Sequence, residues 1–226
     1  MIHHQKQIFL IFSIMVISFG IKAQGKTSSS TFLDKTIFSL RFVKAFSTVN
    51  NDKQSSNINN LYSKGFQAKL LYLISEKFAV AVEPIIHNKG YTNGSNKVNI
   101  TYLDIPLNIE RIKFRPFITP EDFFTIGLGF YGGYAISGKN VNGYNNTTQN
   151  VKFGDAKTDE RTRLDYGINF STTLALATFI EFGFNAQLGI NNVTPKDLQI
   201  NGNKTTLTSM GLFIGVNTNI FKMFKK

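Results

Sequence analysis

The sequence predicts an all-β fold, an eight-stranded antiparallel up-and-down β-barrel that crosses a membrane. Three observations support this prediction. Many segments alternate apolar and polar residues with the two-residue period of a β-strand. The connections between them alternate between long polar loops and shorter turns, as in outer-membrane barrels. After the N-terminal segment, no stretch of useful length has the periodicity of a helix.

The clearest alternation lies in residues 179–190, which read FIEFGFNAQLGI. Successive side chains of a strand point to opposite faces, so this segment has one apolar face and one polar or small face. A length of about 11 residues suits a tilted transmembrane strand. We therefore expect the apolar face to contact lipid and the polar face to line the barrel interior. The residues expected to face lipid are Ile180, Phe182, Phe184, Ala186, Leu188 and Ile190.

The N-terminal segment has the features of a signal peptide over residues 1–23. Lys6 precedes an apolar run from Ile8 to Ile21, and Ala23 supplies a small residue at the expected cleavage site. A membrane anchor or a buried helix is the alternative. Residues 24–34 form a Ser/Thr-rich segment expected to be flexible, residues 35–222 the barrel, and residues 223–226 a basic tail. The chain has no cysteine, so backbone pairing and packing must stabilise an exported protein.

Eight segments carry the strand pattern, and each places apolar residues on one face. They are residues 36–46, 64–75, 77–88, 97–111, 123–137, 163–176, 179–190 and 205–221. Their polar faces include charges of both signs, and a lone buried charge costs several kcal/mol unless it is paired. We therefore predict an interior ion-pair network with a structural role, a proton or ion path being the alternative. The predicted network comprises Arg41, Lys69, Glu83, Asp104, Asp165 and Glu181.

The connections indicate how the barrel lies in the membrane. Those after the odd-numbered strands are polar and mostly long, and those after the even-numbered strands are shorter. This pattern places both termini on the periplasmic side and the long loops outside. The long connections are residues 50–60, 89–96, 138–160 and 191–204, and the shorter ones are residues 75–77, residues 113–122 and a turn near Ala177.

Other kinds of site are poorly supported by the sequence. Residues 127–132 match G-x-G-x-x-G, but strand alternation continues through Ile136, where a dinucleotide site needs a helix. His87 is the one histidine after residue 23 and is expected at a rim or in a loop, with a general base as the alternative. The spacing of His, Cys and carboxylates predicts no metal site or cofactor. Pro106 lies inside a strand and predicts a bulge or bend.

The chain is basic, with a net charge of +11, and without residues 1–23 it has 23 bases against 14 acids. The lysines are scattered over loops and termini rather than clustered, so contact with anionic lipid phosphates explains them better than nucleic acid. A soluble lipocalin-like barrel is the alternative for the fold. Its water-facing wall would be rich in Lys and Glu, whereas the polar faces here are mostly Gly, Ser, Thr and Asn.

One hexapeptide resembles a known family. Residues 102–107, YLDIPL, are similar to a strand of the outer membrane protein β-barrel domain family of Bacteroidetes-type bacteria, often labelled porin family proteins. The segments 115–117, 127–134 and 165–168 look like further signatures of that family, and the resemblance extends over residues 32–221. It implies an integral outer-membrane barrel without an assigned substrate or catalytic residues.

These features predict a non-catalytic outer-membrane protein with a filled interior and a structural or surface-interaction role. A narrow porin for small solutes is the alternative, followed by a rim lipid-modifying enzyme and the lipocalin-like carrier. The expected partners are outer-membrane lipids, including lipopolysaccharide, and the barrel assembly machinery, and no cofactor is expected. The barrel is followed by the basic tail of residues 223–226, whereas many outer-membrane proteins end on an aromatic residue.

Overall fold

A computed structural model describes most of the predicted barrel. The described residues are 35–51, 58–114, 117–119, 122–154, 156, 158–176, 179–195 and 204–217. The predicted signal peptide, residues 24–34 and the basic tail lie outside them. Within the described residues, no helix is long and apolar enough to cross a membrane.

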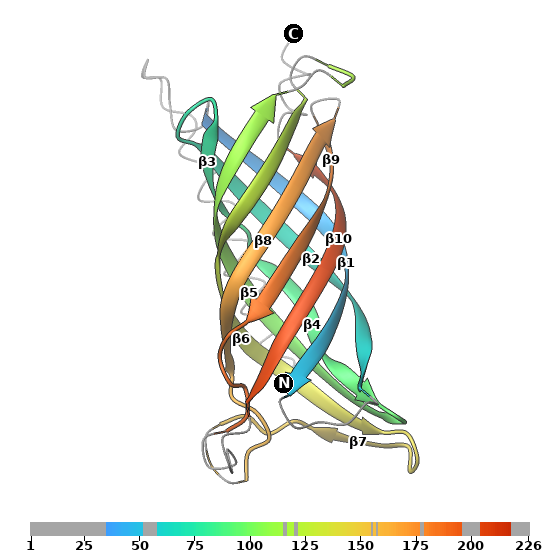
Figure 1. Cartoon of the computed structure of the whole chain (residues 1–226). Helices are drawn as coiled ribbons and strands as arrows, with labels where there is room; N and C mark the ends of the chain where they lie inside the picture. The colour runs from blue at the N-terminus through green and yellow to red at the C-terminus, as the bar shows by residue number, and fades with distance from the viewer. Residues whose placement is uncertain are drawn as a thin grey trace, which may run out of the picture. The chain divides into compact units, whose positions relative to one another are not determined.

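The described chain consists mainly of antiparallel β-strands (Figure 1). Its strands are β1 (Thr36–Asn51), β2 (Ile58–Leu73), β3 (Phe78–Val82), β4 (Ile85–Asn93), β5 (Asn96–Phe114), β6 (Phe123–Asn142), β7 (Thr147–Asn150), β8 (Leu164–Leu176), β9 (Ile180–Gly189) and β10 (Thr205–Asn217). Several begin or end beyond the predicted limits because the alternation continues into residues that the sequence assigns to loops.

The strands close into a ring. β1 pairs with β2 on one side and with β10 on the other, so the first and last strands meet. β5 pairs with β6 along its whole length, which joins the two halves of the sheet. β3 and β4 together form one position in the ring, and β7 pairs only with the loop end of β6 among the described strands. The result is the predicted eight-stranded antiparallel barrel.

The division between β3 and β4 is a local gap in hydrogen bonding, not a change of register. Val82 pairs with Leu107 and Ile85 with Asp104, so the same number of residues lies between these pairs on both strands. Pro84 has no N–H to donate, but its carbonyl accepts a bond from Ala68 at 2.9 Å. No bulge lies at Pro106, because pairing with β6 runs through that residue without a change of register.

The bulge lies instead at the loop end of the same strand pair. Thr101 pairs with Ser137 and Tyr102 with Ala135, so Ile136 is an extra residue in β6. An extra residue reverses the alternation beyond it. Ser137, which the alternation of β6 before the bulge would place inside the barrel, is therefore half-buried, and Gly138 takes the buried position.

The predicted orientation of the faces is confirmed. Phe182 is 41% exposed on the outside of the barrel, while its neighbour Glu181 is 1% exposed. The same contrast recurs around the ring, where Leu128 and Phe130 of β6 are exposed and Tyr131 is buried. The barrel is apolar outside and largely polar inside, the reverse of a soluble barrel.

Apolar side chains also occupy the interior at three levels. Leu71, Ala79, Ala81, Ile112, Phe123 and Ala175 pack together near the short turns. Val43, Ala45, Ile85 and Phe213 form a middle group. Val49, Ile100, Tyr102, Ala135, Val193 and Leu207 pack together near the long loops. Charged side chains lie between these groups.

Candidate functional site

Charged interior residues gather in two clusters, one on each side of the middle apolar group. We call Arg41, Lys69, Glu83, Glu110 and Glu181 the turn-side cluster, since they lie next to the apolar group at the short turns. We call His87, Lys89, Asp104 and Asp165 the loop-side cluster. All nine side chains are buried, with at most 3% of each residue exposed. They come from strands β1, β2, β4, β5, β8 and β9 and from the β3–β4 junction.

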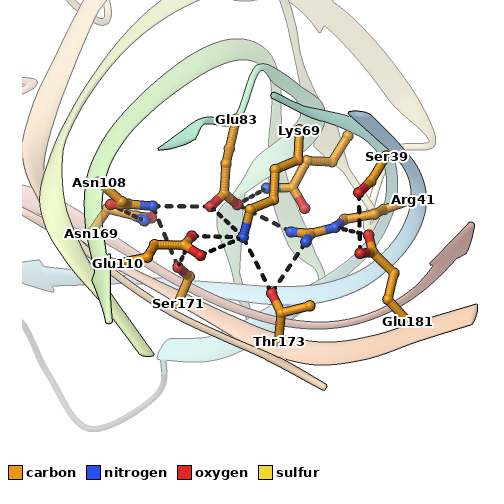
Figure 2. Close-up of polar contacts among 11 residues, drawn as sticks. Ser39, Arg41, Lys69, Glu83, Asn108, Glu110, Asn169, Ser171, Thr173 and Glu181 are labelled. Atoms are coloured by element: carbon orange, nitrogen blue, oxygen red, sulfur yellow. Dashed lines mark hydrogen bonds and ion pairs between the residues drawn. The ribbon is translucent and has the colours of Figure 1, made fainter. Parts of the chain in front are cut away.

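Arg41 of the turn-side cluster contacts two of its carboxylates (Figure 2). Its Nε donates to Glu181 Oε1, and its Nη1 lies 3.2 Å from Glu83 Oε2. Its Nη2 donates to Thr173 Oγ1 at 3.1 Å. The guanidinium also stacks over the Phe213 ring, 4.0 Å from the ring centroid. A planar cation with several donors can bridge two carboxylates in this way, which an ammonium group does less well.

Lys69 supplies the second cation of this cluster. Its Nζ lies 2.6 and 2.8 Å from the two carboxylate oxygens of Glu110 and 3.6 Å from Glu83 Oε1. Glu83 also accepts bonds from Gln67 at 2.9 Å and Asn108 at 3.1 Å. Each buried carboxylate therefore faces at least one cation and further donors, as burial of charge requires.

The loop-side cluster is built around Lys89. Its Nζ bridges Asp104 Oδ2 at 2.9 Å and Asp165 Oδ2 at 2.7 Å. His87 Nε2 lies 2.6 Å from the same Asp104 oxygen. Tyr131 donates its hydroxyl to Asp165 at 3.1 Å, and Lys89 lies over the Tyr131 ring at 4.3 Å. Tyr131 thus contributes both a hydrogen bond and a cation–π contact.

The structure places all six residues of the predicted network in the interior, but it divides them. Arg41, Lys69, Glu83 and Glu181 lie in the turn-side cluster, and Asp104 and Asp165 in the loop-side cluster. No ion pair joins the two clusters among the described residues. The cation that serves Asp104 and Asp165 is Lys89, which the sequence interpretation assigned to a loop.

Three interior residues were missed or misplaced at the sequence level. Glu110 has the same parity as Asp104 and Asn108 on β5, so the alternation itself could have found it. His87 and Lys89 follow Glu83 at two-residue intervals on the inward face. The expectation of His87 at a rim or in a loop is wrong, because His87 is 3% exposed inside the barrel.

The geometry of the two clusters favours a role in neutralising buried charge over a role in catalysis. His87 and Asp104 resemble the base and orienting acid of a hydrolytic triad. However, the apolar group containing Tyr102, Ala135 and Leu207 lies between this pair and the loops, where a substrate would enter. Among the described residues, no group of His, Cys, Asp and Glu could hold a metal ion.

The chain was compared with known proteins. It is similar to several solved structures, among them the following three. Ail, the attachment invasion locus protein of Yersinia pestis, has 10% identity and a TM-score of 0.46, covering 81% of this chain and 99% of that chain. The outer membrane protein OprG from Pseudomonas aeruginosa has 12% identity and a TM-score of 0.43, and the match covers 80% of this chain and 95% of that chain. Neisserial surface protein A has 12% identity and a TM-score of 0.39, with the same coverage. No protein-family model and no curated protein sequence matches the chain.

Proposed function

We propose that this chain is an integral outer-membrane β-barrel protein with a structural or surface-interaction role and no catalysis. The observation that carries the proposal is the distribution of polarity across a closed ring. Large apolar side chains such as Ile109, Phe130 and Leu212 are 65–69% exposed outside, whereas charged side chains are buried inside. Soluble monomers rarely expose apolar surface on this scale, and a closed sheet satisfies its backbone groups in lipid.

The height of the apolar surface supports a bilayer. On β5 the outward row is apolar between Arg111 and Thr101, with Ile105, Leu107 and Ile109 exposed. A tilted strand rises roughly 2.5 Å per residue along a barrel axis, so ten residues span roughly 25 Å. This matches the apolar band of outer-membrane barrels. Exposed tyrosines 62, 134 and 166 lie toward the loop ends of their strands, as in an interfacial aromatic girdle.

A filled interior supports a non-porin role. The interior of an eight-stranded barrel is just wide enough to be filled by side chains or to hold one small ligand. Here apolar groups occupy both ends and ion-paired side chains the space between. A narrow porin is the alternative function, and it would need a water-filled path through these layers.

The loop end offers the surface for interactions in this proposal. The β6–β8 connection carries the β7 hairpin, whose four residues are exposed. Its later part is anchored to the barrel, since Arg161 donates to the Tyr91 hydroxyl at 3.2 Å and lies over the Tyr91 ring. Phe153 stacks with Arg163 in the same connection. We propose that this partly fixed loop is presented outside the cell.

The closer family assignment is also a proposal. The YLDIPL segment lies within β5, where its residues alternate between the interior and the outer face. This agrees with the resemblance to the Bacteroidetes-type outer-membrane barrel family. A soluble lipocalin-like carrier would have the opposite orientation of faces. A rim lipid-modifying enzyme would change the lipid A of cells that overexpress the chain, and we expect no such change.

Membrane fractionation combined with a gel-shift assay tests the proposal. We expect the chain in the outer-membrane fraction, and we expect unboiled samples to migrate differently from boiled ones because the folded barrel resists detergent. Recovery in the aqueous periplasmic fraction would contradict the proposal.

A further inference from the structure

Two lysines lie side by side on the outer face of the barrel. Lys44 of β1 and Lys64 of β2 are direct partners in the antiparallel register, and both are exposed. Directly opposed residues in such a pair have Cβ atoms about 5 Å apart. The two ammonium groups can therefore reach a common ligand.

Aromatic pairs frame the lysines along both strands. Phe42 and Phe66 contact each other on the turn side, with ring centroids 5.7 Å apart. Phe46 and Tyr62 pair on the loop side at 6.4 Å. Phe66 and Tyr62 are more than 70% exposed. Two cations thus interrupt an otherwise apolar, aromatic stretch of the outer wall.

Among the described residues, no carboxylate forms an ion pair with Lys44 or Lys64. The ion pairs of the barrel involve interior side chains, and neither Lys44 nor Lys64 takes part in them. The partner of Lys44 on the other neighbouring strand is Leu212. Like charges directly opposite each other destabilise a sheet unless an anion lies between them. The arrangement therefore calls for an external anion.

The height of the pair indicates where this anion comes from. The outward row of β1 becomes apolar at Phe38, and Lys44 lies six residues further along, which corresponds to roughly 15 Å along the axis. In a band of roughly 25 Å this is the half nearer the long loops, roughly 10 Å from that edge. Lysines in this half of the band extend their amines toward lipid phosphates at the edge while their stems remain in the apolar layer.

We infer that Lys44 and Lys64 form a binding site for the phosphate groups of an outer-leaflet glycolipid of the lipid A type. The turn-side pair, Phe42 and Phe66, would contact its acyl chains, and the two amines would bind its phosphorylated sugar. This inference rests on the proposed function, because it needs the barrel in an outer membrane with its long loops outside.

Native mass spectrometry of the full chain in detergent micelles, titrated with diphosphoryl lipid A, tests the site. A lysine near a membrane surface contributes about a factor of five to the binding of anionic lipid. We expect roughly 30-fold weaker binding for the Lys44→Gln/Lys64→Gln double variant and roughly fivefold weaker binding for each single variant. The matched control is Lys113→Gln, which removes an exposed lysine at the turn end of β5 and should leave binding unchanged.

Three results would overturn the inference. The first is unchanged affinity in the double variant when its gel shift shows a folded barrel. The second is displacement of the lipid by inorganic phosphate, which would identify a site for a free anion. The third is a change of oligomeric state in the double variant without loss of lipid, which would identify a surface for a second copy. Failure of the wild-type chain to enter outer membranes would instead contradict the proposed function.

Discussion

Arg41 neutralises two buried carboxylates at once, those of Glu83 and Glu181, and its loss should be costly. Removing one partner of a buried ion pair leaves an uncompensated charge and costs about 3–5 kcal/mol. We expect Arg41→Ala to lower the free energy of unfolding by about that amount, and Glu181→Ala to lower it by less, because Arg41 keeps its pair with Glu83. Urea titration of the folded barrel in micelles, read by the gel shift, measures the change.

A double variant separates pairing from packing. Arg41→Gln/Glu181→Gln should cost less than the sum of the Arg41→Gln and Glu181→Gln single variants, because the loss of Glu181 removes the carboxylate that the loss of Arg41 would leave without its cation. Arg111→Gln is the matched control, since Arg111 is exposed on the outer face of β5. Additive costs in the double variant would refute a coupled network.

Gly183 makes room for the ring on which Arg41 stacks. A Cβ at this position would lie 2.3 Å from Phe213 Cζ and 2.0 Å from the Thr172 carbonyl oxygen. Because one of these atoms belongs to the backbone, the strain cannot be relieved by a side-chain rotation alone. We expect Gly183→Ala to cost about 1–3 kcal/mol by overpacking, measured by the same titration.

Gly132 of β6 provides the control for this substitution. It faces outward, and a Cβ there would meet no atom within 4 Å. Gly132→Ala should therefore leave the unfolding midpoint nearly unchanged. If Gly183→Ala and Gly132→Ala unfolded at the same urea concentration, the interior would accommodate the extra methyl group, and the overpacking prediction would be wrong.

At the scale of the element, the β5–β6 turn depends on one carboxylate. Asp122 Oδ2 accepts bonds from three successive backbone N–H groups, those of Phe117, Ile118 and Thr119, at 3.1, 2.6 and 2.9 Å. Its other oxygen, Oδ1, accepts a hydrogen bond from the Thr119 hydroxyl at 2.7 Å. Consecutive amides around an anion form a concave nest, which explains how a turn that is not tight is held.

Replacing this carboxylate should loosen the turn. Hydrogen bonds to a charged group contribute about 1.5–3 kcal/mol, so Asp122→Ala should lower the unfolding free energy by an amount in that range, and Asp122→Asn by less. Glu76→Ala, which removes an exposed acid from the β2–β3 turn, is the control. If Asp122→Ala unfolds at the wild-type urea concentration, the nest is not a stabilising feature.

The limits of sequence prediction also appear at this scale. The alternation of apolar and polar residues predicted every strand of the ring. Each strand has one apolar outer face and one largely polar inner face, so its residues must alternate along its whole length. The alternation could not locate the bulge at Ile136, since one extra residue changes the register without changing the local composition. It also placed Lys89 in a loop, because the strand continues beyond the last apolar residue of its lipid face.

For the whole molecule, the interior is a stack of layers rather than one network. The six residues predicted together share the interior, but their pairing depends on the stagger of the strands around the ring. Asp104 and Glu110 lie on the same face of β5, yet Asp104 contacts Lys89 and Glu110 contacts Lys69. Stagger is set by shear and closure, which the sequence of a single strand does not reveal.

The layering leads to a prediction about conductance. An ion crossing the barrel would have to pass the apolar groups around Leu71 and Leu207 and both charged clusters. Removing an ion from water into such layers costs several kcal/mol at each. We therefore expect no stable channel steps when the purified barrel is reconstituted in planar bilayers. A preparation of a known porin in the same bilayers provides the positive control.

The Arg41→Gln variant shows whether any ions that cross the bilayer pass through the barrel interior. If rare openings do occur, their ion selectivity should be the same in the wild-type barrel and in the variant, because the ions would cross lipid defects and not the interior. A selectivity that changes with Arg41 would mean that ions pass the turn-side cluster. The alternative function of a narrow porin would then replace the structural or surface-interaction role.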